Sequence, residues 1–258
     1  MTDEQELVAR SFQDMSEWLK TPLGSTLLKA EKDILERMIN RRFGYHLLQM
    51  SCADIAIHED SPIGHKICLT PAEHSKQGAL VAQAEAVPLA SESVDMVLLH
   101  HVLDYSSDPH QLLREADRVL IAGGDLLIIG FNPFSTWGIR HKLGRRKQKS
   151  PWQARLLTSL RLCDWLKLLD FQIDQVHYGM YAMPINRQGL IKYSSLFGKF
   201  AQKLNWPTGA FYIISARKQR TPLMPIREPW KAIPRHVGLA LGDNASMAPS
   251  NPHKFTLH

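Results

Sequence analysis

The feature that most constrains the fold of this sequence is an ordered series of patterns over residues 94–131. The run 94–99 is almost continuously apolar, which is typical of a strand buried inside a parallel sheet. Asp108 and Pro109 follow as an N-cap and a first-turn proline, and apolar residues then recur at helical spacing over 112–120. These patterns predict a buried strand followed by a capped amphipathic helix.

The glycine pair Gly123-Gly124 is predicted to end this helix, and a second buried strand is predicted over 125–131. A strand, a helix and a strand in this order form a βαβ unit. Such a unit implies a parallel sheet covered by helices, so we expect an α/β fold.

Weaker patterns extend this architecture in both directions. Thr21 and Pro22 predict the start of a helix, and Gly44 ends its apolar periodicity. Further strands are predicted at 45–50, 66–70, 79–82, 171–176 and 211–216, with another helix at 156–169.

Length and composition indicate one α/β domain with extensions. The chain has 258 residues, 44% of them hydrophobic, so it can bury a core, and it has no apolar run of the roughly 18–20 residues that a membrane span needs. Residues 1–43 are expected to form a helical segment and residues 44–220 the domain. Residues 221–258 hold six of the 15 prolines and lack apolar periodicity, which predicts a disordered basic tail.

The compartment is predicted to be the cytoplasm. Residues 1–6 are acidic and resemble no export signal. The three cysteines, Cys52, Cys68 and Cys163, are too few and too widely spaced for a disulfide framework or a zinc knuckle.

Charge is divided unevenly along the chain. Residues 1–134 carry 11 Lys/Arg and 20 Asp/Glu, a balance of −9, whereas residues 135–258 carry 20 and 5, a balance of +15. Such an asymmetry can indicate an anionic partner: a phosphate-bearing substrate, a nucleic acid or an acidic membrane surface. A solvated basic loop is the simpler interpretation and is preferred. Residues 132–150, with Trp137 and a basic run, are expected to form a mobile lid over a substrate.

A family resemblance covers residues 84–133 without a gap. The residues that carry it are Ala84 to Leu89, Ser93 to Val97, His101 to Asp104, Asp108-Pro109, Leu113 to Glu115, Arg118 to Leu120 and Gly123 to Leu126. The stretch resembles the class I S-adenosylmethionine-dependent methyltransferases of the type 11 group, and weaker similarity extends over 44–217. The resemblance implies a Rossmann-like, seven-stranded, mostly parallel sheet with helices on both faces, an antiparallel last strand, and S-adenosylmethionine as cofactor.

The resemblance also implies site residues. Residues expected to bind the donor are Gln49, Met50, Ser51, Cys52, Thr70, Gln83, Ala84, Glu85 and His100. Candidate proton acceptors for the substrate are His101, Asp104 and Tyr105.

The first two family motifs are altered in this chain. Ser51, Ala53 and Ile55 replace the three glycines of the loop after the first strand, and Thr70 stands where the family has a ribose-binding acid. Losing a charged acceptor costs about 1.5–3 kcal/mol of binding free energy. The prediction is therefore a methyltransferase acting on a small acceptor, with a catalytically inactive methyltransferase-fold scaffold as the alternative.

A metal site is not predicted. His100 and His101 are adjacent, and neighbouring residues on a strand point to opposite faces, so they are not expected to chelate one ion together. The acceptor, its target atom and the oligomeric state do not follow from the sequence.

Overall fold

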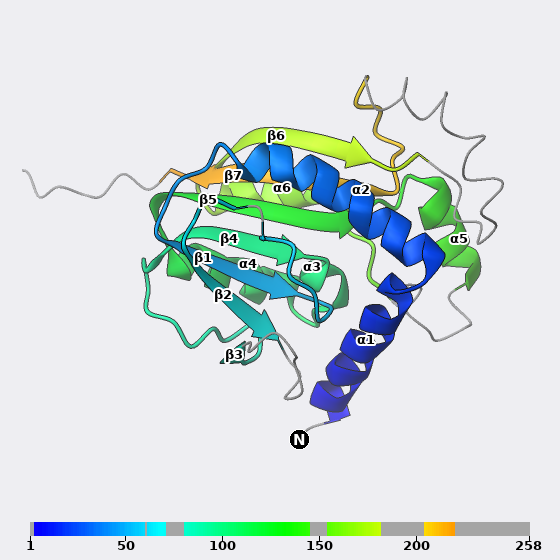
Figure 1. The fold of residues 1–258 in the computed structure, drawn as a ribbon, viewed down its shortest axis with the longest axis horizontal. Coiled ribbons are helices and arrows are strands. Elements are labelled where there is room, and N and C mark those ends of the chain that lie inside the picture. The colour runs from blue at the N-terminus through cyan, green and yellow to red at the C-terminus, as the bar shows by residue number, and fades with distance from the viewer. Residues whose placement is uncertain (1–2, 60, 71–79, 145–153, 182–203, 220–258) are drawn as a thin grey trace, which may run out of the picture. The chain divides into compact units, whose positions relative to one another are not determined.

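The computed structural model describes residues 3–59, 61–70, 80–144, 154–181 and 204–219 (Figure 1). The helices are α1 (Asp3–Leu19), α2 (Pro22–Ile39), α3 (Val102–Tyr105), α4 (Pro109–Val119), α5 (Thr136–Gly144) and α6 (Ser159–Leu168). The strands are β1 (His46–Ser51), β2 (His65–Thr70), β3 (Leu80–Val81), β4 (Val94–His100), β5 (Leu120–Phe131), β6 (Phe171–Gly179) and β7 (Phe211–Lys218). The predicted tail, residues 221–258, lies outside the described residues and stays a prediction.

The seven strands form one sheet in the order β3-β2-β1-β4-β5-β7-β6. Neighbours from β3 through β5 pair in parallel, and β7 runs antiparallel to both β5 and β6. The predicted mostly parallel sheet with an antiparallel last strand is confirmed. The order reverses between β1 and β4, because the chain proceeds from β1 to β2 on one side and from β4 to β5 on the other.

Two helix starts follow their predicted caps, and one predicted helix end is wrong. The Thr21 side chain accepts a hydrogen bond from Gly24 N–H at the start of α2, and Asp108 caps α4 in the same way. Helix α4 ends at Val119 rather than at the glycine pair. The pair lies inside β5, where the register with β4 shifts and Gly123 adopts φ +77°. The glycines therefore accommodate a strand irregularity instead of a helix end.

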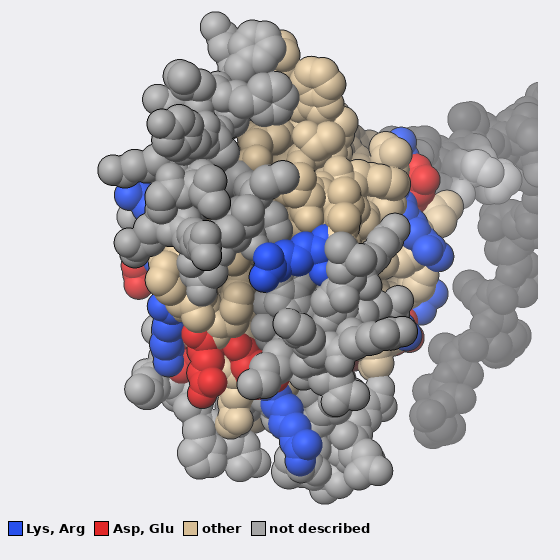
Figure 2. Space-filling view, turned by 90° about the vertical axis from the view of Figure 1, so that its right-hand side faces the viewer, with Lys and Arg blue, Asp and Glu red and all other residues tan. Residues whose placement is uncertain are grey.

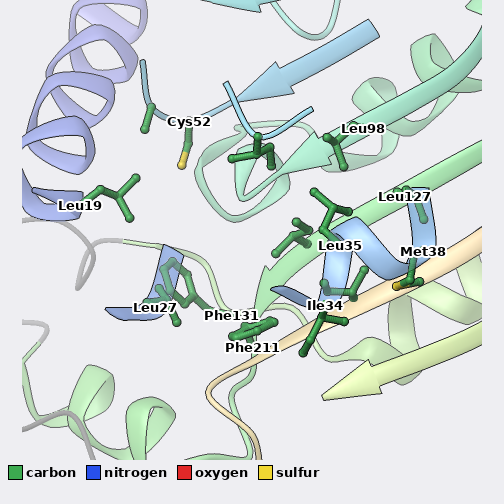
Figure 3. Close-up of a cluster of buried hydrophobic side chains, with 14 of the residues drawn as sticks. Leu19, Leu27, Ile34, Leu35, Met38, Cys52, Leu98, Leu127, Phe131 and Phe211 are labelled. Carbon is green, nitrogen blue, oxygen red and sulfur yellow. The ribbon is translucent and has the colours of Figure 1, made fainter. Parts of the chain in front are cut away.

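Helices cover both faces of the sheet, which gives two apolar cores. On one face α4 and α6 pack against the strands. On the other face α1 and α2 cover β1, β4, β5 and β7, and Figure 3 shows part of this core, with α2 contributing Leu27, Ile34, Leu35 and Met38. The apolar periodicity of α2 thus places its buried stripe against the sheet.

The connection from β1 to β2 contains no helix among its described residues, 52–59 and 61–64. Cys52, Ala53, Ile57 and Ile63 of this loop are buried in the same core as the residues of α1 and α2. Because parallel strands are usually joined through a helix, a short loop leaves part of this face to be covered by other elements. The N-terminal helices share that covering role.

The predicted lid over residues 132–150 is wrong for its first half. Residues 136–144 form α5, and Trp137 is only 3% exposed and lies edge-on to Trp18 at a centroid distance of 6.0 Å. Asn132 is also buried, and its amide donates to the carbonyls of Pro207 and Gly209. These contacts fix the start of the segment to the core. Residues 145–150 lie outside the described residues.

Gly24 allows the close turn between α1 and α2. A Cβ atom at this position would overlap the carbonyl oxygen of Trp18 and the Cα of Leu19. We therefore predict that Gly24→Ala lowers the free energy of unfolding by about 1–3 kcal/mol, despite the better helix propensity of alanine. Denaturant unfolding measures this change.

Gly64→Ala is the matched control, because nothing lies within 4 Å of a Cβ built at Gly64. Its unfolding midpoint should stay within experimental error of the original chain. Equal stability of Gly24→Ala and Gly64→Ala would contradict the assignment of a close backbone approach.

Candidate functional site

The carboxyl ends of β1 and β4 meet where the strand order reverses. Ser51 pairs with His100 in the ladder, and the backbone N–H of Cys52 donates to the His100 carbonyl at 3.1 Å. In open α/β sheets the crevice beyond the carboxyl strand ends at such a reversal is the usual ligand site. Five of the residues predicted to bind a ligand (Gln49, Met50, Ser51, Cys52 and His100) lie at this junction.

Gln49 is buried and uses its side-chain amide to shape the loop after β1. Its Nε2 donates to the carbonyl of Ile55 at 2.6 Å, and its Oε1 accepts from the backbone N–H of Ile57 at 3.0 Å. The His58 Nδ1 atom lies 2.6 Å from the same Oε1. Met50 points into the opposite core. Gln49 therefore holds the loop in place, whereas Met50 belongs to the core on the other face of the sheet.

The two adjacent histidines converge on one carboxylate, so the prediction that they face opposite ways is wrong. His100 Nε2 lies 3.2 Å from Glu31 Oε2, and His101 Nε2 lies 2.9 Å from Glu31 Oε1. The reason is that His101 has left the strand: it adopts a left-handed conformation (φ 51°, ψ 4°) at the start of α3. All three side chains are completely buried.

The outer nitrogens of both histidines are held as well. Ser51 Oγ lies 2.9 Å from His100 Nδ1, and Asp104 Oδ2 lies 3.0 Å from His101 Nδ1. We name Glu31, His100, His101 and Asp104 the Glu31 cluster. It joins α2 to β4 and α3, and it touches the end of β1 through Ser51.

The protonation states of the Glu31 cluster follow from its contacts. Burial alone would raise the pKa of Glu31, but the charge of His101 and hydrogen bonds from both histidines lower it to about 2. Burial would lower the pKa of His101, but the charge of Glu31 and the hydrogen bond to Asp104 raise it to about 9. Burial, with the charge of His101 adding to it, lowers the pKa of His100. At neutral pH Glu31 is thus a carboxylate, His101 an imidazolium and His100 a neutral imidazole. Asp104 Oδ2 accepts from both His101 Nδ1 and the backbone N–H of Phe131, which is the bonding pattern of a carboxylate.

With these protonation states, each hydrogen bond made by His100 and His101 has one donor and one acceptor. The imidazolium of His101 donates from both nitrogens, while His100 donates from Nε2 and accepts the Ser51 hydroxyl proton at Nδ1. Ser51 Oγ in turn accepts from the N–H of Ala53 at 3.2 Å. Ligand atoms of Glu31, His100 and His101 also lie within 4.8 Å of one another, a spacing that a metal ion could bridge. The prediction that His100 and His101 cannot chelate one ion together is therefore wrong.

Cys52 reports the electrostatic potential beside the Glu31 cluster. Burial and then the charges of Asp104 and Glu31 raise the pKa of its thiol well above the usual value. Cys52 is consequently a neutral thiol at physiological pH and a poor nucleophile. The charges of the two carboxylates therefore act on groups at the end of β1.

The other residues predicted to bind a ligand line the neighbouring strand ends. Thr70 is buried at the end of β2, and its carbonyl accepts from the N–H of Ala82 at 3.1 Å. Glu85 is half-buried, and its Oε1 accepts from the Ser106 hydroxyl at 2.5 Å, which ties the segment after β3 to the residue after α3. Gln83 is exposed and Ala84 half-buried.

The three candidate proton acceptors differ in how far their side chains are exposed. His101 and Asp104 are buried, and Asp104 Oδ2 also accepts from the N–H of Phe131 at 3.0 Å. Tyr105 is half-buried, with its hydroxyl directed to Met15 Sδ at 3.6 Å. Because His101 holds a proton on each ring nitrogen at neutral pH, it is not available there as a base.

Glu31 is the site residue that the sequence analysis missed. It lies four residues after Leu27 and four before Leu35, inside the buried stripe of α2. A single carboxylate in an otherwise apolar helical stripe is the available sequence signal, since burying an unpaired charge is very unfavourable.

Two sequence comparisons find relatives of this chain. The sequence model of the family described as "Methyltransferase domain" matches residues 46–128. The uncharacterized protein YafS of Escherichia coli K12 is 36% identical over 211 residues, covering 80% of this chain and 82% of YafS.

Solved structures share the fold at low sequence identity. A Thermotoga maritima protein described as an S-adenosylmethionine-dependent methyltransferase, possibly a histamine N-methyltransferase, superposes with a TM-score of 0.63 at 19% identity, covering 83% of this chain and 99% of that one. A geranyl diphosphate methyltransferase in complex with GPP and sinefungin gives a TM-score of 0.53 at 12% identity, with coverages of 84% and 100%.

The raised pKa of His101 predicts a pH-dependent stability. The folded pKa of about 9 exceeds the ordinary value of 6.5, so the stabilisation is complete below pH 6.5 and is lost as the pH rises to 9. The free energy of unfolding should fall by up to about 3 kcal/mol across this window. His101→Gln should remove this dependence, which denaturant unfolding at a series of pH values measures.

His65→Gln is the control, because His65 is exposed at the opposite end of the sheet. It should keep the slope of the original chain between pH 6.5 and 9. The same slope in His101→Gln would mean that His101 does not carry the buried proton.

Proposed function

Because this chain belongs to the class I S-adenosylmethionine-dependent methyltransferases of the type 11 group, we propose that it transfers a methyl group from S-adenosylmethionine to a small, anionic acceptor. S-adenosylmethionine is its cofactor. The observation that carries donor binding is the pair of buried carboxylates of the Glu31 cluster at the reversal of strand order, while the exposed guanidinium of Arg155 next to α3 supports the anionic acceptor.

The charge of the Glu31 cluster fits the cofactor. S-adenosylmethionine carries a sulfonium cation and an ammonium group, and a negative potential in a dry, low-dielectric region attracts both. Two carboxylates against one imidazolium supply that potential at the ends of β1 and β4. Glu31 and Asp104 would therefore face the charged end of the cofactor.

Residues at the ends of β2 and β3 fit the nucleoside end. Thr70 would offer a hydroxyl to the ribose in place of a carboxylate, and Ala84 and Glu85 would lie beside the adenine. The hydrogen bond between Glu85 and Ser106 holds the segment after β3 close to α3. The binding residues would thus come from four neighbouring strand ends.

The loop after β1 supports a weaker site than a glycine-rich loop. The N–H groups of Cys52, Ala53 and Ile55 donate to His100, Ser51 and Ala53 respectively. Donors engaged in this way are not available to the cofactor's carboxylate. This observation favours the alternative, an inactive scaffold with the methyltransferase fold, and makes donor binding the first point to test.

The chemistry that the cofactor supplies is an electrophilic methyl group on a sulfonium. The chain's part is to orient the acceptor and to exclude water, which can provide most of the rate without a strong base. The Glu31 cluster forms a dry floor, because its side chains are fully buried. Tyr105, half-buried just after this floor, is the candidate for contact with the acceptor.

Arg155 supports an anionic acceptor. Its backbone N–H donates to the carbonyl of Asp104 at 2.6 Å, and its exposed guanidinium reaches the carbonyl of Ser107 at 3.4 Å. A positive charge is therefore held next to α3. Figure 2, which faces the carboxyl ends of the parallel strands, shows Asp and Glu as well as Lys and Arg among the described residues.

No helix in the described part of the chain is long and apolar enough to cross a membrane. The cytoplasmic location remains part of the proposal.

Donor binding is expected to depend on the hydroxyl of Thr70. Thr70→Val keeps the side-chain shape and removes one neutral hydrogen bond, so affinity for S-adenosylmethionine should fall about two- to tenfold. Isothermal titration calorimetry measures the change. Ser93→Ala removes a half-buried hydroxyl just before β4, at the end of the strand away from the site, and should leave the affinity unchanged.

A titration that detects no binding of S-adenosylmethionine to the original chain at millimolar concentration would favour the scaffold. Equal affinities for Thr70→Val and the original chain would instead remove Thr70 from the site.

Transfer itself is expected to favour anions. With isotopically labelled S-adenosylmethionine and a panel of small carboxylates, phosphates and their neutral analogues, label should enter the anionic members preferentially. Arg155→Gln should weaken this preference and its salt dependence while leaving donor affinity unchanged, because the guanidinium is exposed and screened by salt. Equal labelling of anionic and neutral acceptors would contradict the role of charge.

A further inference from the structure

We infer that Glu31, held by His101 and accompanied by Asp104, is a positioning residue that makes this site prefer the cationic donor over its neutral product. The inference rests on the proposed donor binding and assigns a function to a residue outside the matched region, 46–128. Glu31 acts through its charge and through the orientation of the two histidines.

The first observation is the place of the Glu31 carboxylate. Residue 31 is on α2, yet its two oxygens lie against His100 and His101, at the carboxyl end of β4. Its side chain is completely buried in the apolar stripe of the helix. Burying a carboxylate is unfavourable unless its geometry is fixed by partners, and here each oxygen has one imidazole.

The second observation is the imbalance of charge. His101 lies between two carboxylates, Glu31 and Asp104, whereas His100 lies between one of them, Glu31, and the hydroxyl of Ser51. Burial is the main cause of the raised pKa of the Cys52 thiol, and the charges of Asp104 and Glu31 add to it, so both carboxylates lie close to the end of β1. Their negative potential therefore extends to the strand end beside which the donor would bind.

The charge of the donor changes in the reaction. The acceptor's lone pair forms the new bond to the methyl carbon, and the carbon–sulfur bond breaks with its electron pair going to sulfur. A sulfonium cation thereby becomes a neutral thioether. A fixed negative potential stabilises the donor and loses this attraction to the product, so it favours release of the product over its retention.

A preference for the cationic donor over the thioether product is not expected from either of two other roles of Glu31. If Glu31 only packed α2 onto the sheet, its neutral variant would affect donor and product equally. If the Glu31 cluster held a divalent metal ion, the site would be positive and the donor would bind less tightly than the product.

The test compares three ligands by calorimetry: S-adenosylmethionine, S-adenosylhomocysteine and sinefungin, which carries an amine in place of the sulfonium. The original chain should bind the two cationic ligands about tenfold more tightly than the thioether. Glu31→Gln should weaken binding of the cationic ligands about tenfold and leave the thioether nearly unchanged. Glu31→Asp keeps the charge and should retain most of the preference.

Glu115→Gln is the matched control, because Glu115 is a carboxylate on α4 that pairs with Arg118. It should preserve the preference. Tighter binding of the thioether by the original chain, or a Glu31→Gln variant with an unaltered preference, would overturn the inference. If Glu31→Gln does not fold, the same comparison is made with Asp104→Asn. This variant should lose the preference for the cationic ligands that the original chain shows.

Two outcomes separate this inference from the proposed function. Failure of the original chain to bind any of the three ligands would contradict the proposed function. Binding of all three with equal affinity would leave donor binding intact and overturn the inference. A stoichiometric metal found by elemental analysis of the purified chain would also overturn it.

Discussion

The ion pairs that run from Glu31 through His101 to Asp104 connect helix α2 to the carboxyl end of β4, where the candidate site lies. Each carboxylate is buried, so each is tolerable only while the imidazolium between them stays in place. Removing one partner of a buried pair costs about 3–5 kcal/mol, because the other charge is left unpaired. The position of α2, the turn at His101 and the end of β4 are therefore coupled through one group of charges.

Much of the sheet is encoded locally and could be predicted. The continuously apolar run 94–99 and the caps at Thr21 and Asp108 act over a few residues, so their structures follow from neighbouring sequence alone. The antiparallel β7 followed from the family resemblance instead, because nothing in 211–216 reveals the direction of its partners. The glycine pair misled the prediction because two glycines permit either a helix end or a strand irregularity.

The site was harder to predict because its contacts join distant segments. His101 takes a left-handed conformation, which a non-glycine residue seldom adopts without tertiary contacts, so its turn toward Glu31 could not be read from adjacent residues. The burial of Trp137 depends on Trp18, more than a hundred residues earlier. By contrast, Glu31 in the apolar stripe of α2 is a signal that the sequence does contain, and it would have predicted a buried partner without identifying it.

The loop between β1 and β2 has a consequence for where this domain begins. Because no helix is described in that loop, α2 and the loop share one face of the sheet, and Figure 3 shows Leu27 and Leu35 in a core with Leu98 and Leu127. The family match starts at residue 46, which is the first residue of β1. A domain boundary placed at residue 46 would remove α1 and α2, whose apolar residues form part of the hydrophobic core. A gene fusion that joined a foreign segment to residue 46 would have to supply both an apolar helix face and one buried carboxylate.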